Sequence, residues 1–380
     1  MFDIASKKWY YNDKINLKEH LSMAYSGKKL GAVIDYIEKY VQTNALSPGS
    51  KLPPERELID KTGVSRVTVR RAMANLQEAG IIYSIHGGGY YLSDKQVSPA
   101  IESIPLVISY NHGDSKILDI VHGAQDYLIQ HNCRLNLSVS GKSSLNEQEI
   151  ITQLYNDGIR SVMVFPVSSE TNTDFYFNMI QKGMHFVFID RKPKKIFGYS
   201  FVQSDNISGG YIATKHLIER GHRKIAMFGF EELENTSSLY ERSLGYLFAL
   251  REAEIPCPEQ YYFISRYRTA SPDIEKLFDP KNGFTAVFAT TDHAAVDIAN
   301  HAFKAGLRIP DDISVIGFDN LDITSVFSPT ISTIAQPFTR LGECAAELAY
   351  GYLTGAYTDN IQKTLPVKLI TRESTEKMLL

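Results

Sequence analysis

The chain has 380 residues, 43% hydrophobic and 22% charged, which is enough for two or three folded domains with sizeable cores. It has no apolar run of about 18 residues, and its first residues lack the apolar segment of a signal peptide. These absences argue against a membrane-spanning or secreted protein and predict a cytoplasmic one without a membrane partner. Cys133, Cys257 and Cys344 are far apart and odd in number, so we expect neither a disulfide framework nor a metal site.

The net charge of −3 is distributed unevenly. Residues 28–95 contain ten Lys or Arg against seven Asp or Glu, a balance of +3, so the rest of the chain carries −6. A basic module joined to an acidic remainder is expected when only one domain neutralises nucleic-acid phosphates.

Residues 1–27 form an N-terminal extension to which the sequence assigns no role. Residues 28–93 then read as one domain. Its first helix is predicted by apolar residues at helical spacing, namely Leu30, Val33, Ile34, Ile37, Tyr40 and Val41.

Two more helices separated by a tight turn follow. The first, 54–62, begins with a proline and has Glu55 in its first turn, where the helix dipole favours acidic residues. Gly63 permits a sharp turn, and Ser65 can cap the second helix. That helix buries a stripe made by Val69, Ala72, Met73 and Leu76 and leaves arginines exposed. These are the parts of a helix-turn-helix.

A hairpin is predicted directly after these helices. Ile81, Tyr83 and Ile85 alternate with other residues, 86–89 is His-Gly-Gly-Gly, and β formers resume at 90–92. The domain is therefore predicted to be a winged helix-turn-helix.

This domain resembles the DNA-binding domain of GntR-family transcriptional regulators between about Leu30 and Leu92. The resemblance rests on the Pro48-to-Leu58 run, the Val64-Ser65-Arg66-x-Thr68-Val69-Arg70 run and the glycine-rich wing. It implies that double-stranded operator DNA is a partner. It also implies a set of DNA-binding residues: Arg56, Ser65, Arg66, Thr68, Arg70, His86 and Gly87.

Different roles are expected within this set. Arg66 and Arg70 lie one turn apart and can reach base edges, whereas Arg56 and Thr68 suit phosphates. The wing glycines admit the backbone to the minor groove. The alternative is that the arginines only solvate a helix and that the wing is a plain turn.

Residues 94–103 break the pattern and read as a linker, and from 104 to 380 short apolar strands alternate with helices. Predicted strands are 105–110, 134–139, 161–165, 185–190, 200–202, 224–229, 262–265, 285–289 and 313–318. Predicted helices are 117–131, 146–157, 207–220, 239–253, 292–305 and 338–354. This alternation predicts an α/β fold with parallel sheets covered on both faces, and its length favours two lobes around a cleft.

Residues 104–376 resemble LacI/GalR-type effector domains, which in turn resemble periplasmic sugar-binding proteins. Ile189-Asp190-Arg191, Tyr240-x-Arg242-x2-Gly245-Tyr246, the 309–320 run and Ser332-Thr333-Ile334-x-Gln336-Pro337 carry this resemblance. It implies a two-lobed, type I periplasmic-binding-protein-like domain that senses a small-molecule sugar and forms a homodimer. The ligand-binding residues that it implies are Asn111, Asp190, Arg191, Arg242, Thr291, Asp292, Asp319 and Gln336.

Structural roles remain open for each of these residues. Asp190 and Arg191 can form a surface salt bridge, and Asp319 can belong to an ordinary turn. Asp292 can serve as the cap of the helix that follows it. In the first cleft loop, His112 beside Asn111 can be a solvated histidine.

A GntR-type head joined to a LacI-type body resembles the arabinose-responsive repressors of Gram-positive bacteria. This resemblance predicts a transcriptional repressor released from its operator by a monosaccharide such as L-arabinose. The alternatives are another sugar, a phosphosugar or a nucleoside. Because Arg191 and Arg242 are the mapped basic groups beside two or three carboxylates, a neutral polyol is favoured over a phosphate.

A sugar-processing enzyme with a DNA-binding head is the alternative from another class. Against it, the chain contains no dinucleotide fingerprint after a strand, no P-loop, no nucleophile elbow and no zinc-type spacing. We therefore expect no catalytic residue and no cofactor.

Overall fold

A computed structural model describes residues 28–376 except 45, 48, 79–80, 86–87, 94–102, 110–114, 231–235, 258–260 and 266–271. The chain forms two compact units, Met1–Ile101 and Glu102–Leu380. We call their described parts the head (residues 28–93) and the body (residues 103–376). The N-terminal extension 1–27 and nearly all of the predicted linker lie outside the described residues. None of the described helices is long and apolar enough to cross a bilayer.

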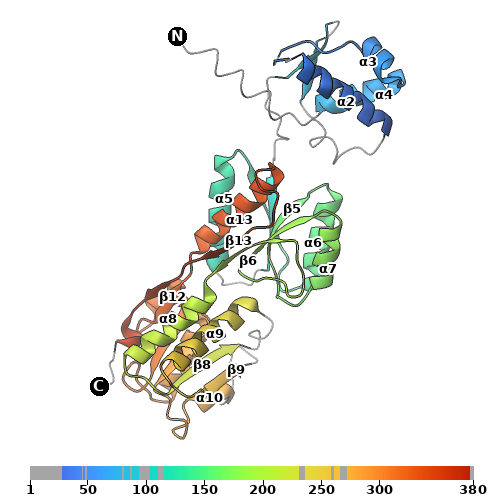
Figure 1. The fold of residues 1–380 in the computed structure, drawn as a ribbon. Coiled ribbons are helices and arrows are strands. Elements are labelled where there is room, and N and C mark those ends of the chain that lie inside the picture. Colours follow the sequence, from blue (N-terminus) through green and yellow to red (C-terminus); the bar gives the residue numbers. More distant parts are fainter. Residues whose placement is uncertain are drawn as a thin grey trace, which may run out of the picture. The chain divides into compact units, whose positions relative to one another are not determined.

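The head is a three-helix domain with a two-stranded hairpin (Figure 1). Gly63 ends the helix before the turn with a φ of 67°, and Ser65 Oγ accepts the Thr68 N–H at 3.3 Å as predicted for a cap. The predicted apolar stripe is fully buried. In order, the elements are α2 (Lys28–Thr43), α3 (Glu55–Thr62), α4 (Arg66–Glu78), β1 (Ile82–Ile85) and β2 (Gly89–Leu92). This is the winged helix-turn-helix that the sequence predicted.

The first lobe of the body is built on a parallel sheet with strand order β13-β7-β6-β5-β3-β4. Its strands are β3 (Ser103–Ile108), β4 (Arg134–Val139), β5 (Ser161–Phe165), β6 (His185–Ile189), β7 (Ser200–Ser204) and β13 (Gln362–Leu365). One face is covered by α5 (Ser115–Gln130) and α13 (Phe338–Leu353), and the other by α6 (Ser144–Asn156) and α7 (Thr173–Gln181) (Figure 1).

The second lobe has the strand order β14-β12-β11-β10-β8-β9, parallel except for the antiparallel edge strand β14. Its strands are β8 (Ile225–Phe230), β9 (Tyr262–Ser265), β10 (Ala286–Ala289), β11 (Ser314–Asp319), β12 (Ser332–Ala335) and β14 (Lys368–Ile370). Its helices are α8 (Asn206–Glu219), α9 (Ser237–Glu252), α10 (Pro272–Leu277), α11 (Asp292–Lys304) and α12 (Asp322–Val326). The chain passes between the lobes after β7, after β12 and after β13.

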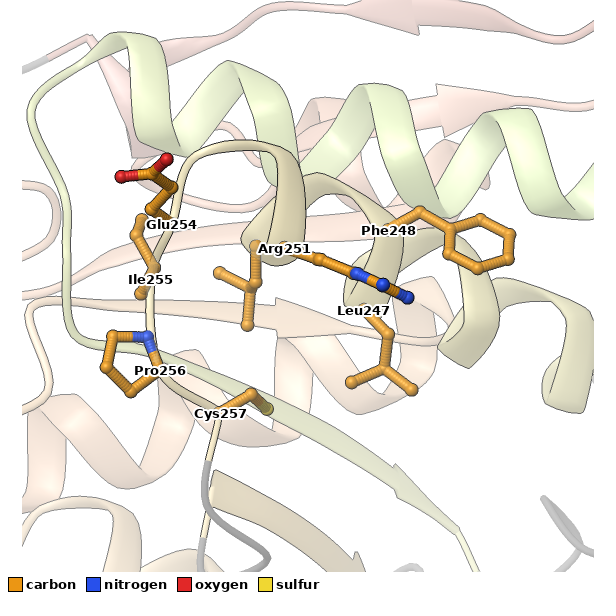
Figure 2. Close-up of a pocket in the computed structure, with 8 residues that line it drawn as sticks. Leu247, Phe248, Arg251, Glu254, Ile255, Pro256 and Cys257 are labelled. Carbon is orange, nitrogen blue, oxygen red and sulfur yellow. The ribbon is translucent and has the colours of Figure 1, made fainter.

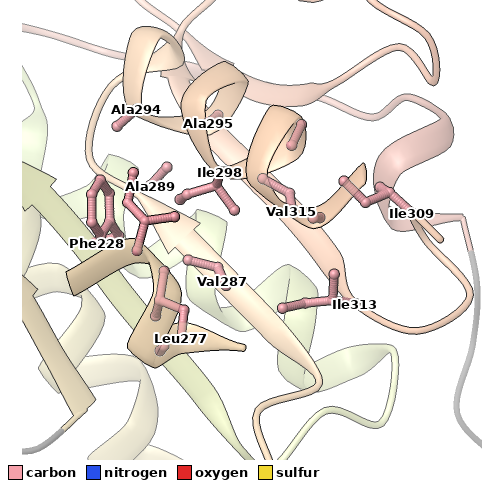
Figure 3. Close-up of a cluster of buried hydrophobic side chains, with 14 of the residues drawn as sticks. Phe228, Leu277, Val287, Ala289, Ala294, Ala295, Ile298, Ile309, Ile313 and Val315 are labelled. Atoms are coloured by element: carbon pink, nitrogen blue, oxygen red, sulfur yellow. The ribbon is translucent and has the colours of Figure 1, made fainter. Parts of the chain in front are cut away.

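Side-chain alternation along the second sheet explains its two helix layers. Phe228 and Val287 point to the layer of α10 and α11, where they pack with Ile298 (Figure 3). Their strand neighbours Met227 and Phe288 pack on the opposite face with α8 and α9. Strands apolar on both faces are the expected consequence of helices on both sides of a parallel sheet.

The predicted α/β class and its two sheets are confirmed, with some differences in detail. β3 runs from Ser103 to Ile108, so the predicted strand 105–110 starts and ends too late. Three short strands, β12 to β14, and three short helices, α7, α10 and α12, were not predicted. β13 and β14 are half-exposed edge strands whose residues alternate only weakly in polarity, so their sequences gave little signal.

Two glycines set the packing of α5 against α13. A Cβ at Gly123 would clash with the Thr339 carbonyl, and one at Gly342 would clash with the Ile120 carbonyl. The helices therefore touch backbone to backbone. We expect Gly123→Ala to lower the free energy of unfolding of the body by about 1–3 kcal/mol through overpacking, measured by urea titration.

The matched control is Gly31→Ala in α2, where the added Cβ meets open space. It should stabilise the head by about 0.5–1 kcal/mol, because alanine is favoured over glycine in helices. A Gly123→Ala protein as stable as the wild type would show that the α5–α13 contact tolerates a methyl group.

Candidate functional site

The arginines predicted to read DNA share one counter-ion in the head. Arg66 Nε lies 3.4 Å and Arg70 Nε 3.1 Å from Oε2 of Glu55, the first residue of α3. Both arginine side chains are more than half exposed, so these ion pairs are weak. Contacts with DNA can replace Glu55 at little cost. The shared carboxylate shows that both arginines lie on one face of α4.

The remaining predicted DNA contacts are accessible where they are described. Arg56 is exposed, and Ser65 and Thr68 bond each other at the start of α4 with 2.9 Å between their hydroxyls. His86 and Gly87 of the wing lie outside the described residues. The sequence predicts only that Glu55 interacts favourably with the dipole of α3. Its contact with the two arginines was not predicted.

In the body, the candidate ligand residues stand at the ends of strands. Asp190 and Arg191 follow β6, Asp319 ends β11, and Gln336 follows β12 at the return to the first lobe. Such strand ends are where open α/β sheets bind ligands. Asp190 and Asp319 have φ values of 64° and 125°, which cost non-glycine residues about 1–3 kcal/mol and concentrate at functional sites.

Asp319 is the centre of a buried charge cluster. Gln336 Nε2 donates to its Oδ1 at 2.6 Å, Arg242 Nη1 lies 3.3 Å from the same oxygen, and Lys116 Nζ pairs with its Oδ2. Burial acts to raise the pKa of Asp319, but the charges of Lys116 and Arg242 outweigh it and lower that pKa below its usual value. Asp319 is therefore a carboxylate.

Arg242 is held rigidly on α9. Its Nε donates to Asn206 Oδ1 at 3.0 Å, its Nη1 donates to the Thr290 carbonyl at 2.7 Å, and its guanidinium lies 3.8 Å from the centre of the Phe318 ring. Helix α9 packs closely against α8 because Gly210 of α8 faces the backbone of Arg242, where a Cβ would clash. The glycine therefore helps to place the arginine.

Helix α9 also joins the two halves of the site. Ser238 Oγ donates to Asp190 Oδ2 at 3.3 Å, and Arg242, one turn later on the same face, reaches Asp319. Asp190 belongs to the first lobe and α9 to the second. Lys192 Nζ, next to this point, pairs with Glu241 Oε1 at 2.6 Å, so the lobes are joined by polar bonds around the site.

Arg191 contacts the first lobe. Its Nη1 donates to the Val167 carbonyl at 3.0 Å, its guanidinium lies 5.2 Å from the centre of the Phe165 ring, and its Nε is 3.9 Å from Asp190 Oδ2. The backbone N–H of Val167 is itself fixed by the buried Glu147 carboxylate at 3.0 Å. Asp190 and Arg191 are thus not the free surface salt bridge that the sequence left open.

Thr291 and Asp292 have structural partners. Thr291, not Asp292, caps α11, since its Oγ accepts the Ala294 N–H at 3.2 Å; the predicted capping role of Asp292 was wrong. Asp292 instead accepts from the Leu321 N–H and the Thr333 hydroxyl, each at 2.6 Å. Burial, followed by the charge of Asp319, raises the pKa of Asp292 to about 6.

Several buried polar atoms in this cluster have no hydrogen-bond partner among the described residues. They are Asp190 Oδ1, Arg191 Nε, Thr290 Oγ and Gln336 Oε1, and they belong to residues that surround Asp319 and Arg242 or follow β6. Buried polar groups are normally satisfied, so this concentration calls for a polar ligand. Asn111, the remaining predicted ligand residue, lies outside the described residues.

A separate pocket of about 550 Å³ lies at the other end of α9 (Figure 2). It is lined by Leu247, Phe248, Leu250, Arg251, Glu254, Ile255, Pro256 and Cys257. This lining is mainly apolar and contains none of the predicted ligand residues. The polar cluster is therefore the better candidate for an effector site.

Lys116 and Ser238 were missed by sequence reasoning. Lys116 is in the first turn of α5 and is about 200 residues from its partner Asp319, and Ser238 is one of two adjacent serines at the start of α9. Neither had a distinctive local pattern. The predicted ligand residue Asn111 precedes Lys116 closely in the chain, and this proximity is the signal that the sequence offers for Lys116.

Each of the two units contains a match to a known protein family. Residues 30–92 match the gntR family of bacterial regulatory proteins, and residues 214–375 match the periplasmic binding protein-like domain. A LacI family transcriptional regulator from Enterococcus faecium, solved with bound ribose, is 25% identical with a TM-score of 0.62. The match covers 73% of this chain and 100% of that one.

Two curated relatives are similar over much of their length. The arabinose metabolism transcriptional repressor of Geobacillus stearothermophilus is 27% identical over 354 residues, which are 90% of this chain and 96% of the relative. The HTH-type transcriptional repressor PurR of Vibrio atlanticus is 30% identical over 234 residues, 60% of this chain and 68% of the relative. The chain therefore belongs to the bacterial transcriptional regulators that join a gntR-family DNA-binding head to a periplasmic binding protein-like body.

Proposed function

We propose that this regulator is a repressor that leaves its operator when a monosaccharide binds between the lobes of the body. The observation that carries this proposal is the group of buried atoms around Asp319 and Arg242 that have no hydrogen-bond partner in the described part of the chain. Asp190 Oδ1 and Gln336 Oε1 need donors and Arg191 Nε needs an acceptor. A sugar hydroxyl supplies both functions.

L-arabinose is the first effector to test, because a relative that aligns along nearly the whole chain is named for arabinose metabolism. Charge-assisted hydrogen bonds contribute about 1.5–3 kcal/mol each, so a few of them give useful affinity. The ligand is bound and released unchanged: the cluster positions fixed charges for recognition, and we assign it no enzymatic role. The protein acts in the cytoplasm, where its DNA is.

We also propose a homodimer, because one winged head reads one half-site and paired heads read a pseudo-palindrome. Exposed apolar side chains on α5 and on its neighbour, the edge strand β4, support this: Leu118, Leu137 and Val139. The second lobe adds Phe303, Ile323 and Val326, of which Val326 is 79% exposed. Sugar binding then changes how the two subunits of the dimer are arranged, and this changes the distance between their heads.

Asp190→Asn tests the effector site. The substitution keeps the shape but removes the charge, so we expect effector binding to weaken about tenfold or more, since charge-assisted bonds are the stronger ones. Operator affinity without effector should stay unchanged. Calorimetry and fluorescence anisotropy measure the two affinities, with the exposed Asp157→Asn as the matched control. Equal effector affinity in both variants would exclude Asp190 from the site.

Arg70→Ala tests the DNA-binding face. We expect a loss of roughly 5- to 150-fold in affinity for a duplex selected by the wild-type protein, because an arginine bound to a base contributes about 1–3 kcal/mol. Effector binding should not change. Arg251→Ala, which removes an exposed arginine from the body, is the control in the same anisotropy assay. A loss shared by both variants would mean that α4 is not the reading helix.

The double variant Leu137→Glu/Val139→Glu tests the dimer. Charges on the edge strand should convert a dimer into monomers in analytical ultracentrifugation and weaken operator binding, because the heads then bind singly. Phe197→Glu changes an 85% exposed apolar residue outside this surface and should leave the dimer intact. A wild-type monomer, or a double variant that remains dimeric, contradicts the assignment.

A further inference from the structure

The carboxylate of Asp319 has three donors from the protein itself. Gln336 and Arg242 lie at Oδ1 and Lys116 at Oδ2, and the side chain is 3% exposed. A sugar hydroxyl can take the place of one of these three donors when that donor moves away. The identity of the donor that leaves therefore determines which ligand fits.

Lys116 is the donor that is free to leave. Arg242 is fixed by Asn206, by the Thr290 carbonyl and by the Phe318 ring, so its guanidinium has three contacts to lose besides that with Asp319. Lys116 approaches from the other lobe, on a flexible four-carbon stem, and its further described contact is the Phe338 ring, 5.3 Å from Nζ. Opening the lobes separates Lys116 from Asp319 and leaves Arg242 in place.

Separation of this pair is unfavourable unless both charges are compensated. Asp319 would lose one hydrogen-bond donor but keep Arg242, whereas Lys116, whose side chain is 13% exposed, would lose the counter-ion that it has among the described residues. A neutral sugar can donate a hydroxyl to Asp319 but offers Lys116 no counter-ion. A hydroxylated acid offers both groups in one molecule.

We propose that Lys116 is the specificity-determining residue of the effector site and that the effector is an acidic monosaccharide. A ligand hydroxyl replaces Lys116 as the donor to Asp319, and the ligand carboxylate becomes the partner of the released ammonium group. Lys116 thus occupies the position at Asp319 Oδ2 that the ligand hydroxyl takes. This inference rests on the proposed function, because it names the ligand class of the same site.

A carboxylate fits better than a phosphate. The ammonium group of Lys116 is the cation released from Asp319, and a carboxylate supplies the one negative charge that pairs with it. A phosphate carries up to two charges and more acceptor oxygens, which the released ammonium group alone cannot satisfy. The sequence had favoured a neutral polyol because it counted two arginines; Lys116 adds a third cation at the site.

Calorimetry on the full chain with matched ligand pairs tests the proposal. The pairs are galacturonate with galactose, glucuronate with glucose and arabinonate with arabinose, and a hexose phosphate is a further ligand. For at least one pair, we expect the wild type to bind the acid at least tenfold more tightly than its neutral parent. Lys116→Met should lose this preference by weakening acid binding tenfold or more, without weakening binding of the neutral sugar.

Two further variants keep the test interpretable. Lys116→Arg retains the charge and should keep the preference for acids, and Lys142→Met removes an exposed lysine of the same lobe and should behave as the wild type. A single cooperative thermal unfolding transition would show that Lys116→Met is folded. If it does not fold, the loss of preference is sought in Lys116→Gln.

The possible failures differ from one another. A neutral sugar that binds most tightly, with equal affinity in Lys116→Met, overturns the role of Lys116 and leaves the proposed function standing. Tightest binding of the hexose phosphate overturns the carboxylate. If neither sugars nor acids bind to the wild type, the proposed function itself fails.

Discussion

The ion pairs of Asp319 with Lys116 and Arg242 are the interaction on which the body depends. The carboxylate ends a strand of the second lobe, Arg242 fixes it from the same lobe, and Lys116 reaches it from the other. Because the charges are buried, neither partner can leave without a replacement. A small polar molecule that replaces one partner therefore changes the relation between the lobes. In this proposal, the group that binds the ligand is the one that also joins the lobes.

The head works by a different physical rule. Its arginines are exposed and only loosely paired with Glu55, so exchange of that carboxylate for DNA costs little. The charges of the body around Asp319 are largely buried, and we propose that they select the ligand. The +3 balance of residues 28–95 against −6 elsewhere reflects this division. A regulator of this design joins a weak, reversible electrostatic surface to a buried and selective one.

Much of this architecture was predictable from the sequence because long amphipathic helices and apolar interior strands carry strong periodic signals. Asp190, Arg242 and Asp319 were predicted as ligand residues through family resemblance, and the structure brings them to one cluster through Ser238 and α9. The edge strands β13 and β14 were missed because half-exposed strands lack a clear pattern. The sequence did not show that Thr291, and not Asp292, caps α11, because threonine and aspartate both cap helices well. Lys116 could not be found, since its role comes from a contact across the fold.

We propose above all that occupation of the body controls the affinity of the head for DNA. The most direct measurement is the dissociation constant of the full-length protein for its selected duplex, with and without a saturating concentration of a ligand that calorimetry shows to bind. We predict that bound ligand weakens DNA binding at least tenfold. A ligand that binds the body and leaves this constant unchanged would contradict it.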